Sequence, residues 1–196
     1  DLKAMSDPNR RKIISADGTG PGPMGPTRMQ NSKPVIAAVE GFALAGGTEI
    51  LQGTDIRVAG KSSTFGLTEP QRGLFPLGGS TIRLRRQIPY TLAAEMLLTG
   101  RRVSAEEALD YGLIGHIVED GHALEKAKEI AERICDNAPL SIKAITKSLR
   151  EFDESFHEVD ALKKEIEIGE PVFTSEDTIE GLTAFAEKRK PIFKGK

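Results

Sequence analysis

The sequence predicts an α/β fold followed by an all-helical C-terminal region. Between residues 33 and 121, short apolar runs that suit buried strands alternate with segments of helical periodicity. Beyond residue 121 the strand-like runs stop, while the helical periodicity continues. Alternating strands and helices are typical of α/β units with mostly parallel pairing. We therefore expect an N-terminal helix and mobile Gly/Pro loop at 1–32, an α/β core with the active site at 33–121, and a helical region at 122–196.

The first 32 residues are the least regular part of the sequence. Residues 1–14, DLKAMSDPNRRKII, have the pattern of a short polar helix. The next stretch, SADGTGPGPMGPTRMQNS, is dense in Gly and Pro, which disfavour regular structure, and so predicts a mobile surface loop. The run KPVIAAVEG then predicts a buried strand bounded by Pro34 and Gly41.

The core continues with short elements separated by turn residues. The order predicted is a helix at 47–55, strands at 55–60 and 63–67, a Pro/Gly loop at 68–79, helices at 80–89, 91–100 and 103–112, and a strand at 113–119. Ile82, Leu84 and Ile88 give the helix at 80–89 an apolar face. Ser104 and Glu107 have the spacing of a capping box, which predicts where the helix at 103–112 begins.

The C-terminal region shows four stretches of helical periodicity, at 123–139, 140–152, 158–170 and 175–190. The second carries an apolar stripe formed by Leu140, Ile142, Ile145 and Leu149. Such a stripe needs a partner, which is either the protein's own core or a neighbouring subunit.

Composition excludes several classes of protein. The formal net charge of the 196 residues is −2, which does not favour binding to nucleic acid or to an anionic membrane. No apolar run approaches the roughly 20 residues of a membrane span. Cys135 is the only cysteine, so no internal disulfide can form, and we expect a cytoplasmic protein. His and Cys residues lack metal-ligand spacing, so neither a metal ion nor a separate cofactor is expected.

The segment GFALAGGTEI, residues 41–50, has features that are typical of a catalytic site. A strand that ends in glycines and continues into a helix leaves backbone N–H groups unpaired in the first helical turn. Those N–H groups can stabilise a developing negative charge, and glycine lets a substrate carbonyl come close. Glu49 follows Gly46 by three residues, so its carboxylate can project beside the same place. The alternative is a purely structural glutamate at a tightly packed helix start.

A second carboxylate, Glu69, directly follows the predicted strand at 63–67. Loops at strand ends are where functional sites are built in α/β folds. Two carboxylates held close together separate their pKa values, so that one can act as an acid and the other as a base. The alternative for Glu69 is a solvated loop glutamate.

Longer blocks of the sequence resemble the crotonase (enoyl-CoA hydratase/isomerase) superfamily. KPVIAAVEGFALAGGTEILQGTDIRVAG is similar to the signature of that family, and STFGLTEPQRGLFPLGGSTIRLRRQIP, LLTGRRVSAEEALDYGLIGHIV and AFAEKRKPIFKGK follow in the family's order. The resemblance implies a spiral of β-β-α repeats with a helical C-terminal region that assembles a homotrimer or a dimer of trimers. It also implies an acyl-CoA thioester substrate.

The resemblance extends to individual residues. It implies that the Gly46 N–H polarises the thioester carbonyl, that Glu49 activates the water added at C3, and that Glu69 exchanges the proton at C2. Phe185 and Lys188 match positions that approach the coenzyme A part of the substrate. Asp1 and Leu2 match the end of a segment of the type AGADLK, which contains the other oxyanion donor, so we expect Leu2 near the substrate and the preceding N-terminal strands to be absent from this chain.

Three functions remain open at this point. Hydration of a 2-enoyl-CoA is favoured because both glutamates are present, and water addition needs a group that deprotonates the water. An isomerase, or another thioester enzyme of the family that uses mainly one carboxylate, is the second. The third is a catalytically silent acyl-CoA or RNA-binding relative that uses the basic runs RLRRQ (Arg83, Arg85, Arg86) and KRKPIFKGK. Without interleaved aromatic residues, those runs do not favour RNA binding.

Overall fold

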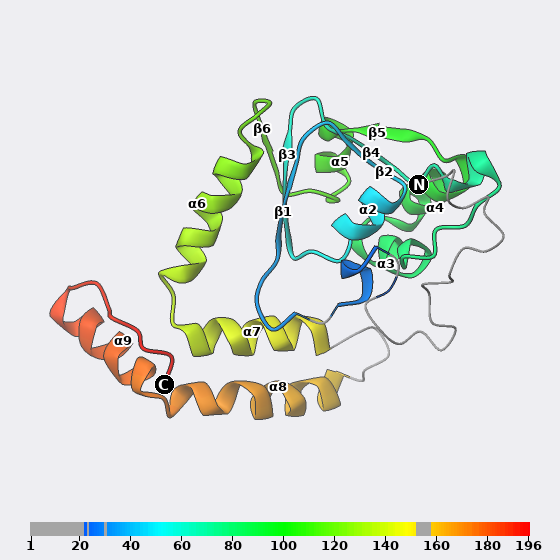
Figure 1. Cartoon of the computed structure of the whole chain (residues 1–196). Helices are drawn as coiled ribbons and strands as arrows, with labels where there is room; N and C mark the ends of the chain where they lie inside the picture. Colours follow the sequence, from blue (N-terminus) through cyan, green and yellow to red (C-terminus); the bar gives the residue numbers. More distant parts are fainter. Residues whose placement is uncertain (1–21, 23, 30, 152–157) are drawn as a thin grey trace. The chain divides into compact units, whose positions relative to one another are not determined.

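The computed structural model describes residues 22, 24–29, 31–151 and 158–196, and these divide into two units (Figure 1). Unit 1 contains residues 36–127 and the described residues among 1–30, while unit 2 contains 31–35 and 128–196. The helix predicted at 1–14 lies outside the described residues. The division of the sequence into 1–32, 33–121 and 122–196 stays a prediction.

Unit 1 has two small sheets. The first has the strand order β1 (Ile36–Val39), β3 (Ile56–Gly60), β6 (His116–Val118), and both of its pairings are parallel. In the second, β4 (Thr64–Gly66) pairs in parallel with β2 (Phe42–Leu44) and antiparallel with β5 (Arg102–Ser104). The predicted α/β class with mostly parallel pairing is confirmed.

Helices surround these sheets. They are η1 (Pro26–Arg28), α2 (Gly46–Leu51), η2 (Glu69–Arg72), α3 (Ser80–Gln87), α4 (Tyr90–Thr99), α5 (Ala105–Asp110) and the start of α6 (Ala123–Cys135). The capping box at Ser104 and Glu107 is present, with both of its hydrogen bonds. Gly100 ends α4 in the left-handed conformation, which glycine adopts without steric cost.

The core of unit 1 lies between the sheets and helices and is formed by apolar side chains. Its largest fully buried members are Phe65, Leu67, Leu84, Met96, Leu113, Val58 and Val103. Leu84 and Ile88 are buried as predicted, but Ile82 is 55% exposed. The prediction of an apolar face that includes Ile82 was therefore wrong in part, because α3 is short and turns only Leu84 fully into the core.

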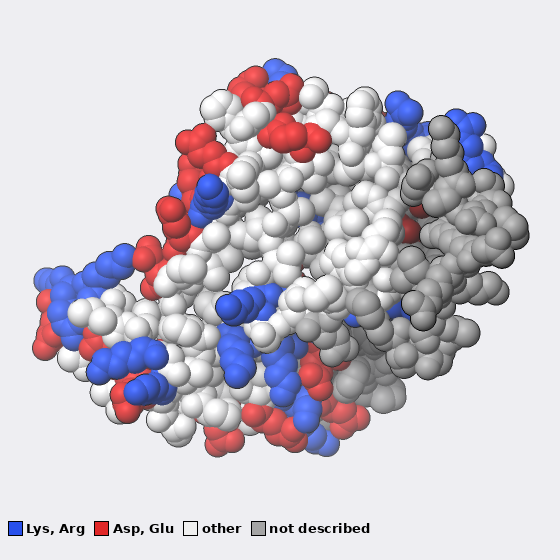
Figure 2. Space-filling view, viewed as in Figure 1, with Lys and Arg blue, Asp and Glu red and all other residues white. Residues whose placement is uncertain are grey.

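Unit 2 is helical. It contains the end of α6 together with α7 (Pro139–Glu151), α8 (Glu158–Phe173) and α9 (Glu176–Glu187). Helices α7 and α8 run side by side (Figure 1). Basic and acidic side chains are interspersed over them (Figure 2). No helix within the described ranges is both long enough and apolar enough to span a membrane.

Candidate active site

A strained turn joins β2 to α2. Ala45 has a φ of +50°, which is unusual for a residue with a side chain, and Gly46 begins the helix directly after it. The Ala45 N–H donates to the Gly66 carbonyl at 2.7 Å, and the buried Thr48 hydroxyl accepts from the Gly66 N–H at 3.0 Å. These contacts with the end of β4 fix the turn. Because Gly46 is the first residue of the helix, its N–H has no partner further back within it.

Glu49 lies on α2, one turn beyond Gly46, and is buried, with 4% of its surface exposed. Its Oε1 accepts the Gly78 N–H at 2.7 Å, and the Ser80 N–H lies 3.5 Å from the same oxygen. A methyl group at Gly78 would lie 2.6 Å from Glu49 Oε2, so any side chain there would force the carboxylate or the loop to move. The carboxylate is thus held by the loop that leads into α3.

Glu69 begins η2, shortly after β4, and is 9% exposed. Its Oε2 is buried without a hydrogen-bond partner in the described part of the chain. This corrects the solvated-loop alternative, because η2 turns the side chain inward. A buried polar atom that lacks a partner is costly, which makes Glu69 a candidate for a reactive group.

The two carboxyls influence each other. Burial raises the pKa of Glu69, and the charge of Glu49 raises it further. Burial also raises the pKa of Glu49, while hydrogen bonds from Gly78 and Ser80 and the positive charge of Arg83 act in the opposite direction. The arrangement can therefore hold one carboxyl protonated while the other is ionised.

The side chain of Met24 lies against the turn. A methyl group at Gly46 would collide with Met24 Sδ, and η1, two residues further on, packs against α2. Met24 is 47% exposed and flexible, so it can move aside for a ligand.

The structure brings together Gly46, Glu49 and Glu69 in unit 1. Phe185 and Lys188 belong to unit 2, where Phe185 is 85% exposed on α9 and Lys188 ends that helix with a φ of +55°. Leu2 lies outside the described residues. No group of three or more His, Cys, Asp or Glu side chains able to hold a metal ion occurs in the described ranges.

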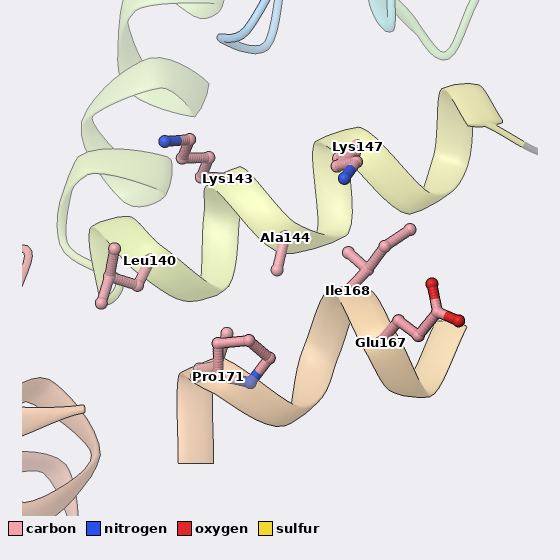
Figure 3. A pocket seen from close by; sticks show the side chains of 8 residues that line it. Leu140, Lys143, Ala144, Lys147, Glu167, Ile168 and Pro171 are labelled. Atoms are coloured by element: carbon pink, nitrogen blue, oxygen red, sulfur yellow. The ribbon is translucent and has the colours of Figure 1, made fainter. Parts of the chain in front are cut away.

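Unit 2 has a groove of its own, with a volume of about 250 Å³, between α7 and α8 (Figure 3). Its walls are mostly hydrocarbon, with Lys143, Lys147 and Glu167 at the edge. This groove contains one carboxylate and none of the predicted site residues, so it does not reproduce the arrangement around Glu49.

Sequence reasoning missed Gly78, Ser80 and Arg83 as parts of the site. Gly78 and Ser80 supply N–H groups to Glu49, and Arg83 acts on it electrostatically. The sequence signal that could have found them is the pair Gly78–Gly79 at the end of the loop that contains Glu69. Paired glycines permit another group to come close to the backbone.

Comparison with known proteins identifies the family. The profile of the family described as enoyl-CoA hydratase/isomerase matches residues 27–196. The chain belongs to this family. The family predicted from the sequence motifs is thereby confirmed.

The family includes close relatives of this chain. Enoyl-CoA hydratase EchA19 of Mycobacterium tuberculosis is 54% identical over 182 residues, which cover 89% of this chain and 68% of the relative. Carnitinyl-CoA dehydratase of Escherichia coli K12 is 39% identical over 202 residues, which cover all of this chain and 76% of the relative. The crystal structure of enoyl-CoA hydratase EchA1 from Mycobacterium marinum matches with a TM-score of 0.91 at 41% identity, covering all of this chain and 75% of that one.

Proposed function

We propose that this chain is an enoyl-CoA hydratase, which adds water reversibly across the C2–C3 double bond of a 2-enoyl-CoA thioester in fatty-acid or related acyl-CoA metabolism. The observation that carries the proposal is the pair of buried glutamates, one with an unpartnered oxygen, beside the Gly46 turn. Family membership and the 54% identity to a hydratase support the same reaction.

In the proposed reaction, the Gly46 N–H binds the thioester oxygen and stabilises the enolate that forms when water attacks. The oxygen of the water bonds to C3 while Glu49 takes a proton from that water. The C2–C3 π electrons move into the enolate. Glu69 gives its proton to C2, which completes the 3-hydroxyacyl-CoA. The raised pKa of Glu69 suits this acid role, because the carboxyl keeps its proton more readily. Proton exchange with solvent resets both groups.

The remaining assignments are proposals drawn from the family. Lys188 contacts a phosphate of coenzyme A as a point charge, Phe185 packs beside the coenzyme, and Leu2 lies near the acyl group. The fold is the family's β-β-α spiral, and its helical C-terminal region forms a homotrimer or a dimer of trimers. Exposed apolar side chains on α8 and α9, such as Phe173 and Leu182, support a subunit contact there.

The test compares two variants with the wild-type chain on crotonyl-CoA and in calorimetric titration with an unreactive acyl-CoA. Glu49→Gln keeps the shape of the site, so the acyl-CoA should still bind while hydration slows strongly. Gly46→Val crowds the carbonyl's approach and should abolish turnover and weaken binding. If Glu49→Gln loses binding as badly as Gly46→Val, Glu49 is a structural helix-start residue and the hydratase assignment is wrong.

A further inference from the structure

The carboxylate of Glu49 is held by a segment that has little rigidity of its own. Gly78 and Gly79 follow each other directly before α3, and Gly79 has a φ of +111°. Consecutive glycines have the largest conformational freedom of any residues. Something must therefore fix the Gly78 N–H in the direction of Glu49.

Arg83, in the first turn of α3, does this from the other side of Gly78. Its Nη1 donates to the Gly78 carbonyl at 3.2 Å, and the guanidinium covers Gly79, where a methyl group would lie 3.1 Å from the same nitrogen. The N–H of Gly78 is thus bound to Glu49 and its carbonyl to Arg83. Removing either contact frees the glycine.

A second set of contacts supports the same loop. The Oγ of Ser80, which is fully buried, accepts from Gln52 Nε2 at 2.9 Å, and the Gln52 carbonyl accepts from Gln87 Nε2 at 2.9 Å. These groups are neutral. Arg83 is the cation whose charge acts on Glu49, and its half-buried position makes that interaction stronger than it would be in water.

We propose that Arg83 is a positioning residue for Glu49: it fixes the glycine that binds the carboxylate, and its charge favours the ionised form that accepts the proton of water. The inference deepens the proposed hydratase function and rests on it. Three charged groups matter here. Arg83 on α3 acts on Glu49, Glu49 in turn acts on Glu69 on η2, and Arg28 on η1 acts on Arg83.

The first experiment measures hydration kinetics against pH for Arg83→Met, which keeps the aliphatic stem but loses both the charge and the donor. Because a loosened base loses its alignment, kcat should fall about tenfold to a hundredfold with KM nearly unchanged. The acid limb of kcat/KM should move to higher pH, because Glu49 then protonates more readily. The matched control is Arg85→Met on the exposed side of the same helix, which should leave both unchanged.

The second experiment follows the Glu49 carboxyl directly by ¹³C NMR titration, with its signal assigned from Glu49→Gln. Its titration should move to higher pH in Arg83→Met and stay near the wild-type position in Arg83→Lys, which keeps the charge. Should Arg83→Met not fold, as judged by circular dichroism, Arg83→Gln replaces it as the neutral variant.

The outcomes separate the inference from the proposed function. The inference is overturned if the neutral Arg83 variant has the same kcat and the same acid limb of kcat/KM as Arg85→Met. It is overturned as well if the neutral variant slows turnover but the Glu49 carboxyl titrates at the same pH as in the wild-type chain. It is also overturned if Arg83→Lys behaves like the neutral variant. If the wild-type chain does not hydrate crotonyl-CoA, the proposed function fails, while the NMR titration still decides whether Arg83 controls Glu49.

Discussion

The two units bury carboxylates in different ways. Within the described ranges, the buried acidic residues are Glu49 and Glu69 in unit 1 and Asp177 in unit 2. Asp177 is satisfied at both oxygens, which accept the N–H groups of Lys194 and Gly195 at 2.6 and 2.8 Å. Glu69 keeps one oxygen buried and unpartnered. Glu69 and Asp177 are therefore both buried but differ in the hydrogen bonding of their oxygens, and we connect the unpartnered oxygen of Glu69 with its proposed acid role.

Exposed hydrocarbon does not distinguish the two units. In unit 2, Phe173 and Phe185 are 77% and 85% exposed, and in unit 1, Phe42 and Leu98 are 73% and 81% exposed. The comparison between the units therefore depends on their buried carboxylates, and the exposed apolar side chains of either unit are candidates for contact with other molecules.

The largest effect is expected for Glu69→Gln. Without the proton donor, turnover should fall by roughly 10²–10⁴ with little change in binding, since that is the usual contribution of general acid–base catalysis. Hydration kinetics on crotonyl-CoA measure it, with the exposed Glu106→Gln as control. Near wild-type turnover in Glu69→Gln would remove Glu69 from the mechanism.

The same variant should be more stable than the wild-type chain at neutral pH. The folded-state pKa of Glu69 is raised above its ordinary value of 4.5, so the folded state holds the proton more tightly than the unfolded chain. Its contribution to stability is present at low pH and is lost as pH rises through the folded pKa. Urea denaturation should therefore show a gain for Glu69→Gln at pH 7 that disappears below about pH 4. A loss of stability at pH 7 would mean that the carboxylate is structural.

The next largest effect is expected for Gly78→Ala. The new methyl group would meet Glu49 Oε2 at 2.6 Å, so the carboxylate or the loop has to move. A displacement of about 1 Å can cost on the order of a hundredfold in rate, and we expect kcat to fall by that order. The control is Gly115→Ala, where a methyl group would sit 3.8 Å from the Arg57 carbonyl oxygen, an ordinary contact. Equal kcat for the two variants would contradict the anchoring of Glu49.

The sequence predicted the fold class, most strands and helices, and the positions of Glu49 and Glu69. Strands β2 and β5 were missed because β2 follows β1 after a short turn and carries no separate apolar run, while β5 overlaps the start of the helix predicted at 103–112. The contacts of Gly78, Ser80 and Arg83 were missed because they depend on how one loop folds back over another helix, which local periodicity does not encode. Burial of Glu69 could not be predicted either, since a glutamate beside Pro70 is usually solvated.

Another prediction concerns the exposed apolar side chains of α9 in unit 2. If α9 contributes to the proposed trimer, Leu182→Asp should shift the sedimentation equilibrium toward monomers, because a charge in an apolar contact is strongly unfavourable. Thr183→Asp, exposed on the same helix, is the control and should leave the assembly unchanged. A wild-type chain that sediments as a monomer at micromolar concentration would contradict the assembly itself.

The smallest effect, and the sharpest contrast with Glu69→Gln, is expected for Asp177→Asn. The substitution keeps the shape but points an amide NH₂ at one of the two N–H groups from Lys194 and Gly195, so a hydrogen bond to a charged acceptor is lost. The free energy of unfolding should fall by about 1–3 kcal/mol. Hydrogen exchange at the Lys194 and Gly195 amides should speed up, while turnover at saturating substrate stays within about threefold of wild type. Protein concentration has to be equal in both samples, because the proposed assembly would add to stability. Glu69→Gln should show the opposite pair of effects: its turnover should fall, while its free energy of unfolding at pH 7 should rise. If Asp177→Asn instead loses turnover without losing stability, a fully partnered carboxylate has a catalytic role, and the unpartnered oxygen no longer distinguishes the two units.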